Sequence, residues 1–272
     1  MIRKTVFCGI DMARLIVGGN PFGGYSYITE RVTRDEMMDY YTAERVVRDL
    51  KYAETLGYTA YISTTCEFTR RFHRQYRNEG GKLDWIAQTH VPLDMRACVN
   101  IAAEGGAAAI FLQGSHADLL IERGDMDKLN KDLGEMRRVG VPVGMATHVP
   151  GNVELAEKGA DVDFFMACLH NMRANNVGRV SSSVSGLKDE PHHFLYEDRE
   201  AMLREIRRTS KPCIAYKILG GGNFAFTGEG LRRSMAEAYA GIKEGDVAAV
   251  GIFQRDKDQL RENAEIVAGI LE

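Results

Sequence analysis

Short apolar runs alternate with longer amphipathic segments along the whole chain, and this alternation occurs eight times. The runs that we interpret as strands span residues 13–19, 59–64, 84–90, 107–114, 141–147, 162–169, 212–219 and 248–253. The segments that we expect to be helical lie near residues 33–56, 67–78, 93–104, 125–139, 151–159, 197–209, 228–244 and 256–271. Apolar strands followed by helices are typical of a parallel sheet with crossover helices.

Eight such units in 272 residues predict an α/β fold, a TIM (β/α)8 barrel that forms one domain over residues 1–272. A doubly wound open sheet is the alternative. The stretch IRKTVFCGIDMARLIV precedes and enters the first barrel strand. It predicts a short β-hairpin, with its turn near Gly9, Ile10 and Asp11, that closes the bottom of the barrel.

Turn and cap residues support the expected helix ends. Thr33 and Glu36 have the spacing of a capping box at the start of a helix. Gly57, Gly140 and Gly159 follow predicted helices, where a left-handed residue often ends the helix.

Composition and charge limit the binding partners and the location that we expect for this protein. Hydrophobic residues make up 44% of the chain, charged residues 27%, and the net charge is −3. This balance gives no electrostatic reason to expect binding to nucleic acid or to an acidic membrane surface. The sequence has no apolar run long enough to span a bilayer, no signal-peptide pattern and five widely spaced cysteines. We therefore expect a cytoplasmic protein with reduced thiols that binds a small molecule, either as a monomer or as a homo-oligomer.

Histidines recur at the carboxyl ends of the predicted strands, where TIM barrels carry their active sites. Four of the seven histidines follow four successive strands, and they are His90, His116, His148 and His170. Polar residues also collect at loop starts for purely structural reasons, which is the alternative explanation. If the four rings converge, they could hold a divalent metal ion together with a carboxylate such as Glu67. They could equally serve as proton donors and acceptors on a carbonyl or polyol substrate.

Two features of the seventh unit add to this picture. Lys217 lies within the apolar run CIAYKIL, so it would be partly desolvated and could act as a Schiff-base nucleophile or as a base. The alternative is a lysine that lines the pocket or pairs with a carboxylate. Gly220, Gly221 and Gly222 follow this strand and form either a phosphate-binding loop or a flexible turn. The longest connection, residues 170–196, follows the sixth predicted strand. It is polar and could form a lid over the site.

The order of these segments resembles the aldo-keto reductase superfamily over nearly the whole chain. The first strand in ARLIVGGNPFGG, the fifth unit VGMATHVPGNVELAEKG, the strand KPCIAYKILGGG and the last unit VGIFQRDKDQLRENAEIV carry the resemblance. It implies the barrel and its bottom hairpin. It also implies that Arg255, Lys257, Glu262 and Asn263 would hold the adenine end of a nicotinamide cofactor.

The catalytic tetrad of that family, an Asp, a Tyr, a Lys and a His, is not matched. GYTAYISTTCEF has no Asp at the matching strand end, Gln88 takes the position of the Lys, and Gln113 takes the position of the His. Thr147 and His148 replace the Ser–Asn pair that holds the nicotinamide, whereas Asn171 fits the family's asparagine. The resemblance therefore supports the barrel and argues against the usual hydride transfer from NAD(P)H.

These observations predict a TIM-barrel enzyme with non-standard chemistry on a small polar carbonyl or sugar-like substrate. We expect lyase- or isomerase-type catalysis by His116, His148, His170, Lys217 and Glu67, either by acid/base chemistry or with a divalent metal held by His90, His116, His148 and His170. Two alternatives remain open, a divergent NAD(P)H-dependent oxidoreductase and a non-catalytic metabolite-binding barrel.

Overall fold

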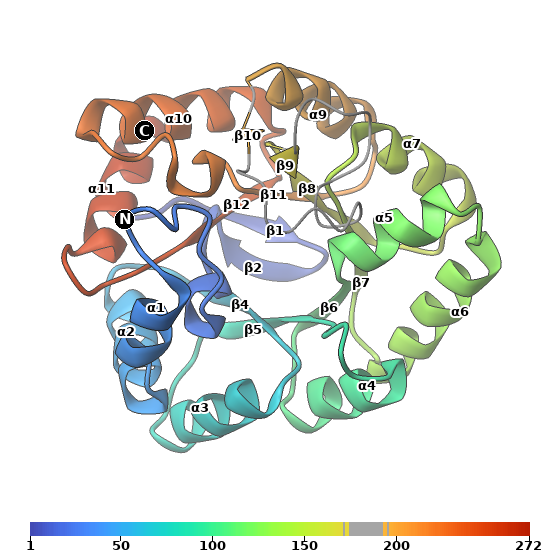
Figure 1. The fold of residues 1–272 in the computed structure, drawn as a ribbon, viewed down its shortest axis with the longest axis horizontal. Helices are drawn as coiled ribbons and strands as arrows, with labels where there is room; N and C mark the ends of the chain where they lie inside the picture. Colours follow the sequence, from blue (N-terminus) through green and yellow to red (C-terminus); the bar gives the residue numbers. More distant parts are fainter. Residues whose placement is uncertain (171, 174–192, 195) are drawn as a thin grey trace.

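The computed structural model describes residues 1–170, 172–173, 193–194 and 196–272. Eight parallel strands form a closed barrel in the order β11–β12–β3–β4–β5–β6–β7–β8 (Figure 1). These strands are β3 (Leu15–Gly18), β4 (Ala60–Thr64), β5 (Asp84–Gln88), β6 (Ala109–Leu112), β7 (Val143–Thr147), β8 (Phe164–Cys168), β11 (Cys213–Tyr216) and β12 (Val247–Gly251). The predicted TIM barrel is confirmed, with each strand inside its predicted run or one residue from it.

Helices surround the barrel (Figure 1). They are α1 (Arg34–Tyr40), α2 (Ala43–Thr55), α3 (Glu67–Asn78), α4 (Met95–Glu104), α5 (Gly114–Glu122), α6 (Met126–Met136), α7 (Pro150–Gly159), α9 (Tyr196–Arg208), α10 (Gly228–Gly241) and α11 (Gln259–Ile270). Short 3-10 helices lie at η1 (Asn20–Gly23), η2 (Arg137–Val139) and η3 (Gly220–Gly222). None of the described helices is long and apolar enough to cross a membrane.

The barrel strands are buried on both faces, which explains why they read as continuous apolar runs. Along β3, Leu15 and Val17 pack in the layer between the barrel and the helices, whereas Ile16 packs in the cluster that fills the barrel interior. Side chains of successive strand residues point to opposite faces, so one apolar run supplies both layers.

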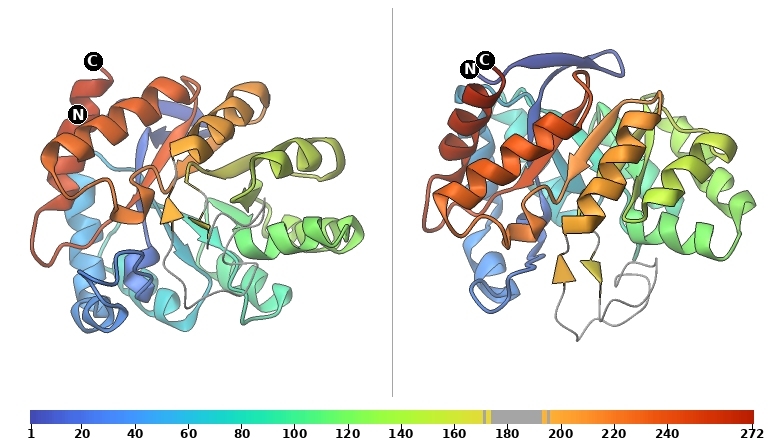
Figure 2. Two further views of the ribbon diagram at one scale, coloured as in Figure 1. Left: turned by 45° about the horizontal axis from the view of Figure 1, so that its top comes forward. Right: turned by 90° about the horizontal axis from the view of Figure 1, so that it is seen from above.

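The predicted N-terminal hairpin is present and consists of β1 (Lys4–Phe7) and β2 (Ile10–Ala13). Its turn lies at Cys8 and Gly9, which both have positive φ, one residue earlier than expected. Phe7 is fully buried in the interior cluster, and its ring packs edge-on against Phe164 at 5.3 Å between centroids. The hairpin closes one end of the barrel, and the short strands β9 (Met172–Arg173) and β10 (His193–Phe194) lie at the other end (Figure 2).

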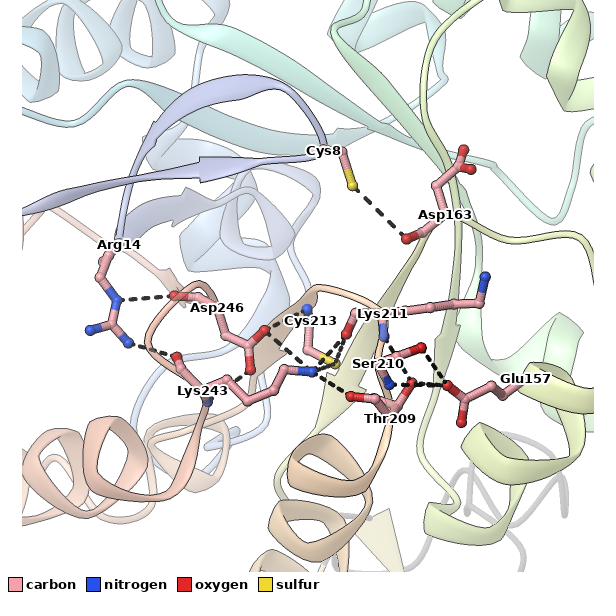
Figure 3. A network of polar contacts seen from close by, with 10 residues as sticks. All are labelled: Cys8, Arg14, Glu157, Asp163, Thr209, Ser210, Lys211, Cys213, Lys243 and Asp246. Atoms are coloured by element: carbon pink, nitrogen blue, oxygen red, sulfur yellow. Dashed lines mark hydrogen bonds and ion pairs between the residues drawn. The ribbon is translucent and has the colours of Figure 1, made fainter.

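A polar network ties the start of β3 to β11 and β12 near the hairpin (Figure 3). The Arg14 guanidinium donates to the backbone carbonyls of Asp246 at 3.1 Å and Lys243 at 3.0 Å. The buried Asp246 carboxylate accepts from the backbone N–H groups of Cys213 at 2.8 Å and Lys243 at 2.9 Å. Because these groups satisfy one another, we assign the network a structural role.

Three local expectations were wrong or incomplete. The segment near 33–56 forms two helices rather than one, because Thr42 caps α2 after α1 has ended at Tyr40. The helix α5 was not predicted at all. Gly57 and Gly140 have the expected left-handed backbone, but Gly159 remains within α7 and does not. The Thr33–Glu36 capping box is confirmed.

Candidate active site

A buried carboxylate, Asp118, organises the polar side chains after β7. It lies on α5, which begins directly after β6 because the side chain of Gln113 caps its first turn. Oδ1 of Asp118 accepts from the Thr147 hydroxyl at 2.5 Å and from the Asn152 amide at 2.9 Å. Oδ2 accepts from the His148 backbone N–H at 3.0 Å and from its ring Nδ1 at 2.9 Å. Both oxygens are therefore satisfied, and each is used to hold the residues after β7.

This arrangement fixes the orientation and protonation of His148. Since the Asp118 carboxylate accepts at Nδ1, the proton of the neutral ring lies on Nδ1 and the lone pair on Nε2. Burial lowers the pKa of His148, and the positive charge of Lys217 lowers it further, while Asp118 acts in the opposite direction. The imidazole is thus neutral near pH 7 and can accept a proton at Nε2.

A glycine is required beside this histidine. A Cβ atom added to Gly114 would lie 2.9 Å from His148 Cε1, 3.2 Å from its Nδ1 and 3.3 Å from the Tyr216 hydroxyl. Real Cβ contacts are almost never that short, so any larger residue at position 114 would displace the ring. The α5 N-terminus therefore sets the position of His148 from one side.

Tyr216 and Cys168 are two further side chains of this region, and they end the adjacent strands β11 and β8. Tyr216 is the last residue of β11, and its ring lies edge-on to the His148 ring at 5.7 Å between centroids. Its hydroxyl donates to the carbonyl of Thr147 at 3.3 Å. Burial raises the pKa of Tyr216 well above its usual value and that of Cys168 to about 11. Both side chains are protonated at neutral pH, so neither is poised as an anionic nucleophile.

Lys217 directly follows β11 and has a left-handed backbone, with φ of 54°. Its Nζ is buried and makes no hydrogen bond within the described part of the chain. The atom lies 4.7 Å from the centre of the Tyr27 ring and 5.8 Å from that of Tyr216. An aromatic box, defined here as Tyr27 and Tyr216, therefore surrounds the amino group.

The segment that carries Tyr27 lies against the loop after β11. The Asn20 amide donates to the Tyr27 hydroxyl at 3.3 Å. The next residue, Ile28, comes within 3.4 Å of the Cβ position of Gly222. Contact between these two connections places Tyr27 over Lys217.

The glycine loop is a closed turn. Gly220, Gly221 and Gly222 all have positive φ. The N–H of Gly220 donates to the carbonyl of Lys217, and the N–H of Gly222 donates to that of Leu219. With these donors used inside the turn, the geometry favours the turn interpretation over a phosphate cradle.

The predicted histidines do not converge. His116 lies within α5, and its Nε2 bonds to Asp132 of α6 at 3.0 Å. His90 is half-buried, and burial lowers its pKa. His170 is fully buried and packs on Phe224 at 5.0 Å between ring centroids. Among the described residues, no group of three or more His, Cys, Asp or Glu side chains could hold a metal ion, so they do not form the metal site expected from His90, His116, His148 and His170.

Glu67, the predicted carboxylate of the site, lies apart from the histidines. Glu67 begins α3, its side chain is 80% exposed, and it pairs with Arg70 at 2.9 Å. It therefore does not join the histidines. His148 and Lys217 follow the two strands that flank β8, and the charge of Lys217 acts on the His148 ring, whereas His170 follows β8 itself and is fully buried.

The residues expected to hold a nucleotide are engaged with one another. Arg255 pairs with Glu36 at 3.0 Å and with Asp256 at 2.9 Å. Lys257 pairs with Glu262 at 2.6 Å, and Asn263 is buried. A 2′-phosphate would have to compete with these carboxylates for both cations. Asn171, His192 and most of the connection 170–196 lie outside the described residues.

Sequence reasoning missed Asp118, Asn152, Tyr216 and Tyr27. Asp118 lies in a helix that the pattern did not predict, and 30 residues separate it from His148. Tyr27 lies almost 200 residues before Lys217 in the sequence. The stretch THVPGN did carry one signal, since Asn152 follows His148 within the first turn of the next helix.

Comparison with known proteins identifies the fold. No family model matches the chain, and no curated protein matches its sequence. The solved structure of Gox0644 in its apo form is 10% identical, with 98% of this chain and 88% of that chain covered and a TM-score of 0.60. The aldo-keto reductase AKR11C1 from Bacillus halodurans is 10% identical, covers 98% and 90%, and has a TM-score of 0.56.

A truncated 3-deoxy-D-arabino-heptulosonate 7-phosphate synthase from Thermotoga maritima is 11% identical, covers 99% and 90%, and has a TM-score of 0.54. These similarities show a TIM barrel. One neighbour is an aldo-keto reductase and another is a synthase, so the resemblance to aldo-keto reductases holds for the barrel and goes no further.

Proposed function

We propose that this TIM barrel is an enzyme that moves protons on a small polar carbonyl or sugar-like substrate, in a lyase- or isomerase-type reaction. One observation carries the proposal: a carboxylate-held histidine, His148, and a buried amine without a hydrogen-bond partner in the described chain, Lys217, lie at one end of the barrel. In this fold, active sites lie where the carboxyl ends of the strands meet.

His148 has the features of a general base. Asp118 accepts from both its backbone N–H and its ring Nδ1, and burial keeps the imidazole neutral near pH 7. Nε2 can then take a proton from a carbon next to a carbonyl group and return it elsewhere on the substrate. We assign the proton-transfer role to His148, because His116 and Glu67 point to other partners.

Lys217 supplies the group that binds the carbonyl. A buried nitrogen surrounded by two aromatic rings has hydrogen-bonding capacity that the described protein does not use. A substrate carbonyl oxygen would use it, and contact with an N–H donor would stabilise negative charge that develops on that oxygen.

The test is solvent-proton exchange, which needs no knowledge of the full reaction. The protein is incubated in D2O with dihydroxyacetone, glyceraldehyde, pyruvate and a set of aldoses and ketoses, and loss of carbon-bound protons is followed by NMR. We expect exchange with at least one compound and a loss of about 100-fold or more in His148→Gln. His116→Gln is the matched control and should exchange at the wild-type rate.

Two results would overturn the proposal. The first is exchange that is equally fast in His148→Gln and in the wild type. The second is carbonyl-dependent oxidation of NADPH with no proton exchange, which would instead support the divergent oxidoreductase. Tight binding of one of these compounds with neither activity would support a non-catalytic metabolite-binding barrel.

A further inference from the structure

We infer that Lys217 reacts covalently, forming an imine between its Nζ and the carbonyl carbon of the substrate. The inference rests on the proposed function and deepens it, because it assigns the reaction to the class in which an amine activates a carbonyl compound. Proton transfer by His148 would then take place on a covalent adduct.

The surroundings of Nζ favour a covalent role for Lys217. Lysine side chains are rarely buried unless a carboxylate pairs with them. Lys217 has no such partner: its Nζ makes no hydrogen bond in the described structure, and Asp118 already accepts four hydrogen bonds from other groups. Tyr27 and Tyr216 contribute aromatic faces instead. Desolvation among apolar groups is a common way in which enzymes activate a lysine as a nucleophile.

The backbone conformation of Lys217 also favours this role. Lys217 is one of two non-glycine residues with positive φ among the described residues, and the other, Cys8, lies in the turn of the N-terminal hairpin. A left-handed backbone is unfavourable for a residue with a Cβ atom. Such strain persists where the surrounding structure enforces it, and it concentrates at catalytic sites. Here it turns the chain as β11 ends and directs Nζ beneath the Tyr27 ring.

His148 can accept and return every proton that moves when Lys217 forms an imine. His148 Nε2 first takes a proton from the charged Lys217 amine. The freed Nζ lone pair attacks the carbonyl carbon, and the C=O π electrons move to oxygen, which takes that proton from His148 and becomes the hydroxyl of a carbinolamine. His148 Nε2 then takes a second proton from Nζ and passes it to that hydroxyl, which leaves as water as the C=N bond forms and gives a protonated imine. Carbonyl and amine thus give imine and water, with no external oxidant or reductant. Tyr216 neighbours both groups, with its ring centre 5.7 Å from that of His148 and 5.8 Å from Nζ.

Access depends on Tyr27. This residue lies between η1 and α1, in a segment without regular helix or strand, and its ring covers Nζ. A substrate that approaches Nζ from this side would have to displace the Tyr27 ring.

Reductive trapping tests the inference. The protein is incubated with pyruvate, glyceraldehyde or dihydroxyacetone and reduced with borohydride, and the products are measured by intact mass and peptide mapping. The expected result is one adduct on Lys217, with the mass of the carbonyl compound less one oxygen atom. Lys217→Met should lose it, whereas Lys158→Arg, which alters an exposed lysine, should keep it. Circular dichroism of Lys217→Met verifies that the variant is folded.

The outcomes separate this inference from the proposed function. Proton exchange that requires His148, without any trapped adduct at Lys217, would overturn the imine and leave the proposed function standing. An adduct spread over surface lysines and undiminished in Lys217→Met would also overturn it. Absence of both exchange and trapping with all compounds would count against the proposed function itself.

Discussion

Asp118 holds His148 at two points with a single oxygen, since Oδ2 accepts from the backbone N–H at 3.0 Å and from ring Nδ1 at 2.9 Å. The carboxylate comes from α5 and the histidine follows β7, so the packing of this helix on the barrel sets the direction of the imidazole. Any change in Asp118 should therefore act on catalysis through His148.

Replacement Asp118→Asn is expected to reduce proton exchange by about 100-fold or more, because an amide nitrogen at either oxygen position would face a donor. It should also lower the free energy of unfolding by about 3 kcal/mol, since it breaks a buried polar network. The matched control is Asp132→Asn, which removes a second buried carboxylate bonded to a histidine, His116. That variant should lose stability but keep its rate per folded molecule. Equal rate losses in the two variants would contradict the assignment of His148.

A second prediction concerns Gly114, which lies against the His148 ring. Gly114→Ala should push the imidazole out of place and lower the exchange rate at least 10-fold, because a Cβ atom would lie 2.9 Å from Cε1. Gly134→Ala is the control, since nothing lies within 4 Å of its Cβ position inside α6. It should raise the free energy of unfolding by about 0.5–1 kcal/mol through helix propensity. Exchange kinetics and urea denaturation measure the two effects.

The pH dependence follows from the direction of the His148 pKa shift. Burial and then the charge of Lys217 lower this pKa below the ordinary value of 6.5. The unfolded chain therefore binds a proton at His148 before the folded chain does, so the stabilising contribution is complete above pH 6.5 and is lost as pH falls through the folded pKa. Exchange should fall over the same acidic range. NMR titration of the ring should show a higher pKa in Lys217→Met than in the wild type, and an unchanged or lower value would contradict the proximity of the two groups.

Since burial also lowers the pKa values of His73 and His90, these two histidines contribute to the acid sensitivity of the wild type as well. The difference in unfolding free energy between the wild type and His148→Gln, measured as a function of pH, isolates the part due to His148. That difference should shrink as the solution becomes more acidic.

The sequence predicted the barrel because its strands are buried on both faces and its helices show one apolar stripe. Only part of the site was predicted, and particular residues explain why the rest was missed. Gly114 and Ser115 gave no helical pattern, so α5 was missed, and with it both Asp118 and the outward direction of His116. A histidine at the end of a strand was expected to face the mouth, but one extra helical turn directs its ring to Asp132.

Lys217 was predicted from its unusual place in an apolar run, and the structure adds what a sequence cannot state. Nothing in CIAYKIL indicates a left-handed backbone, and nothing in GGYSYIT indicates that Tyr27 packs on this amine. Both features depend on contacts between connections that are distant in the chain. Partners of a buried polar group are therefore less predictable than the group itself.

The last prediction separates strain from function at Lys217. Relief of a left-handed backbone by glycine is worth about 1–2 kcal/mol, which exceeds the entropic penalty of glycine, about 0.5–1 kcal/mol. Lys217→Gly should therefore unfold at equal or higher urea concentration than the wild type. Lys217→Met keeps the strain, so any gain in that variant comes from removal of the buried, unpartnered amine. Both should lose exchange and trapping. A stability loss above about 1 kcal/mol in Lys217→Gly would mean that the lysine contributes to packing, because the φ of 54° would then not be a strained conformation retained for chemistry.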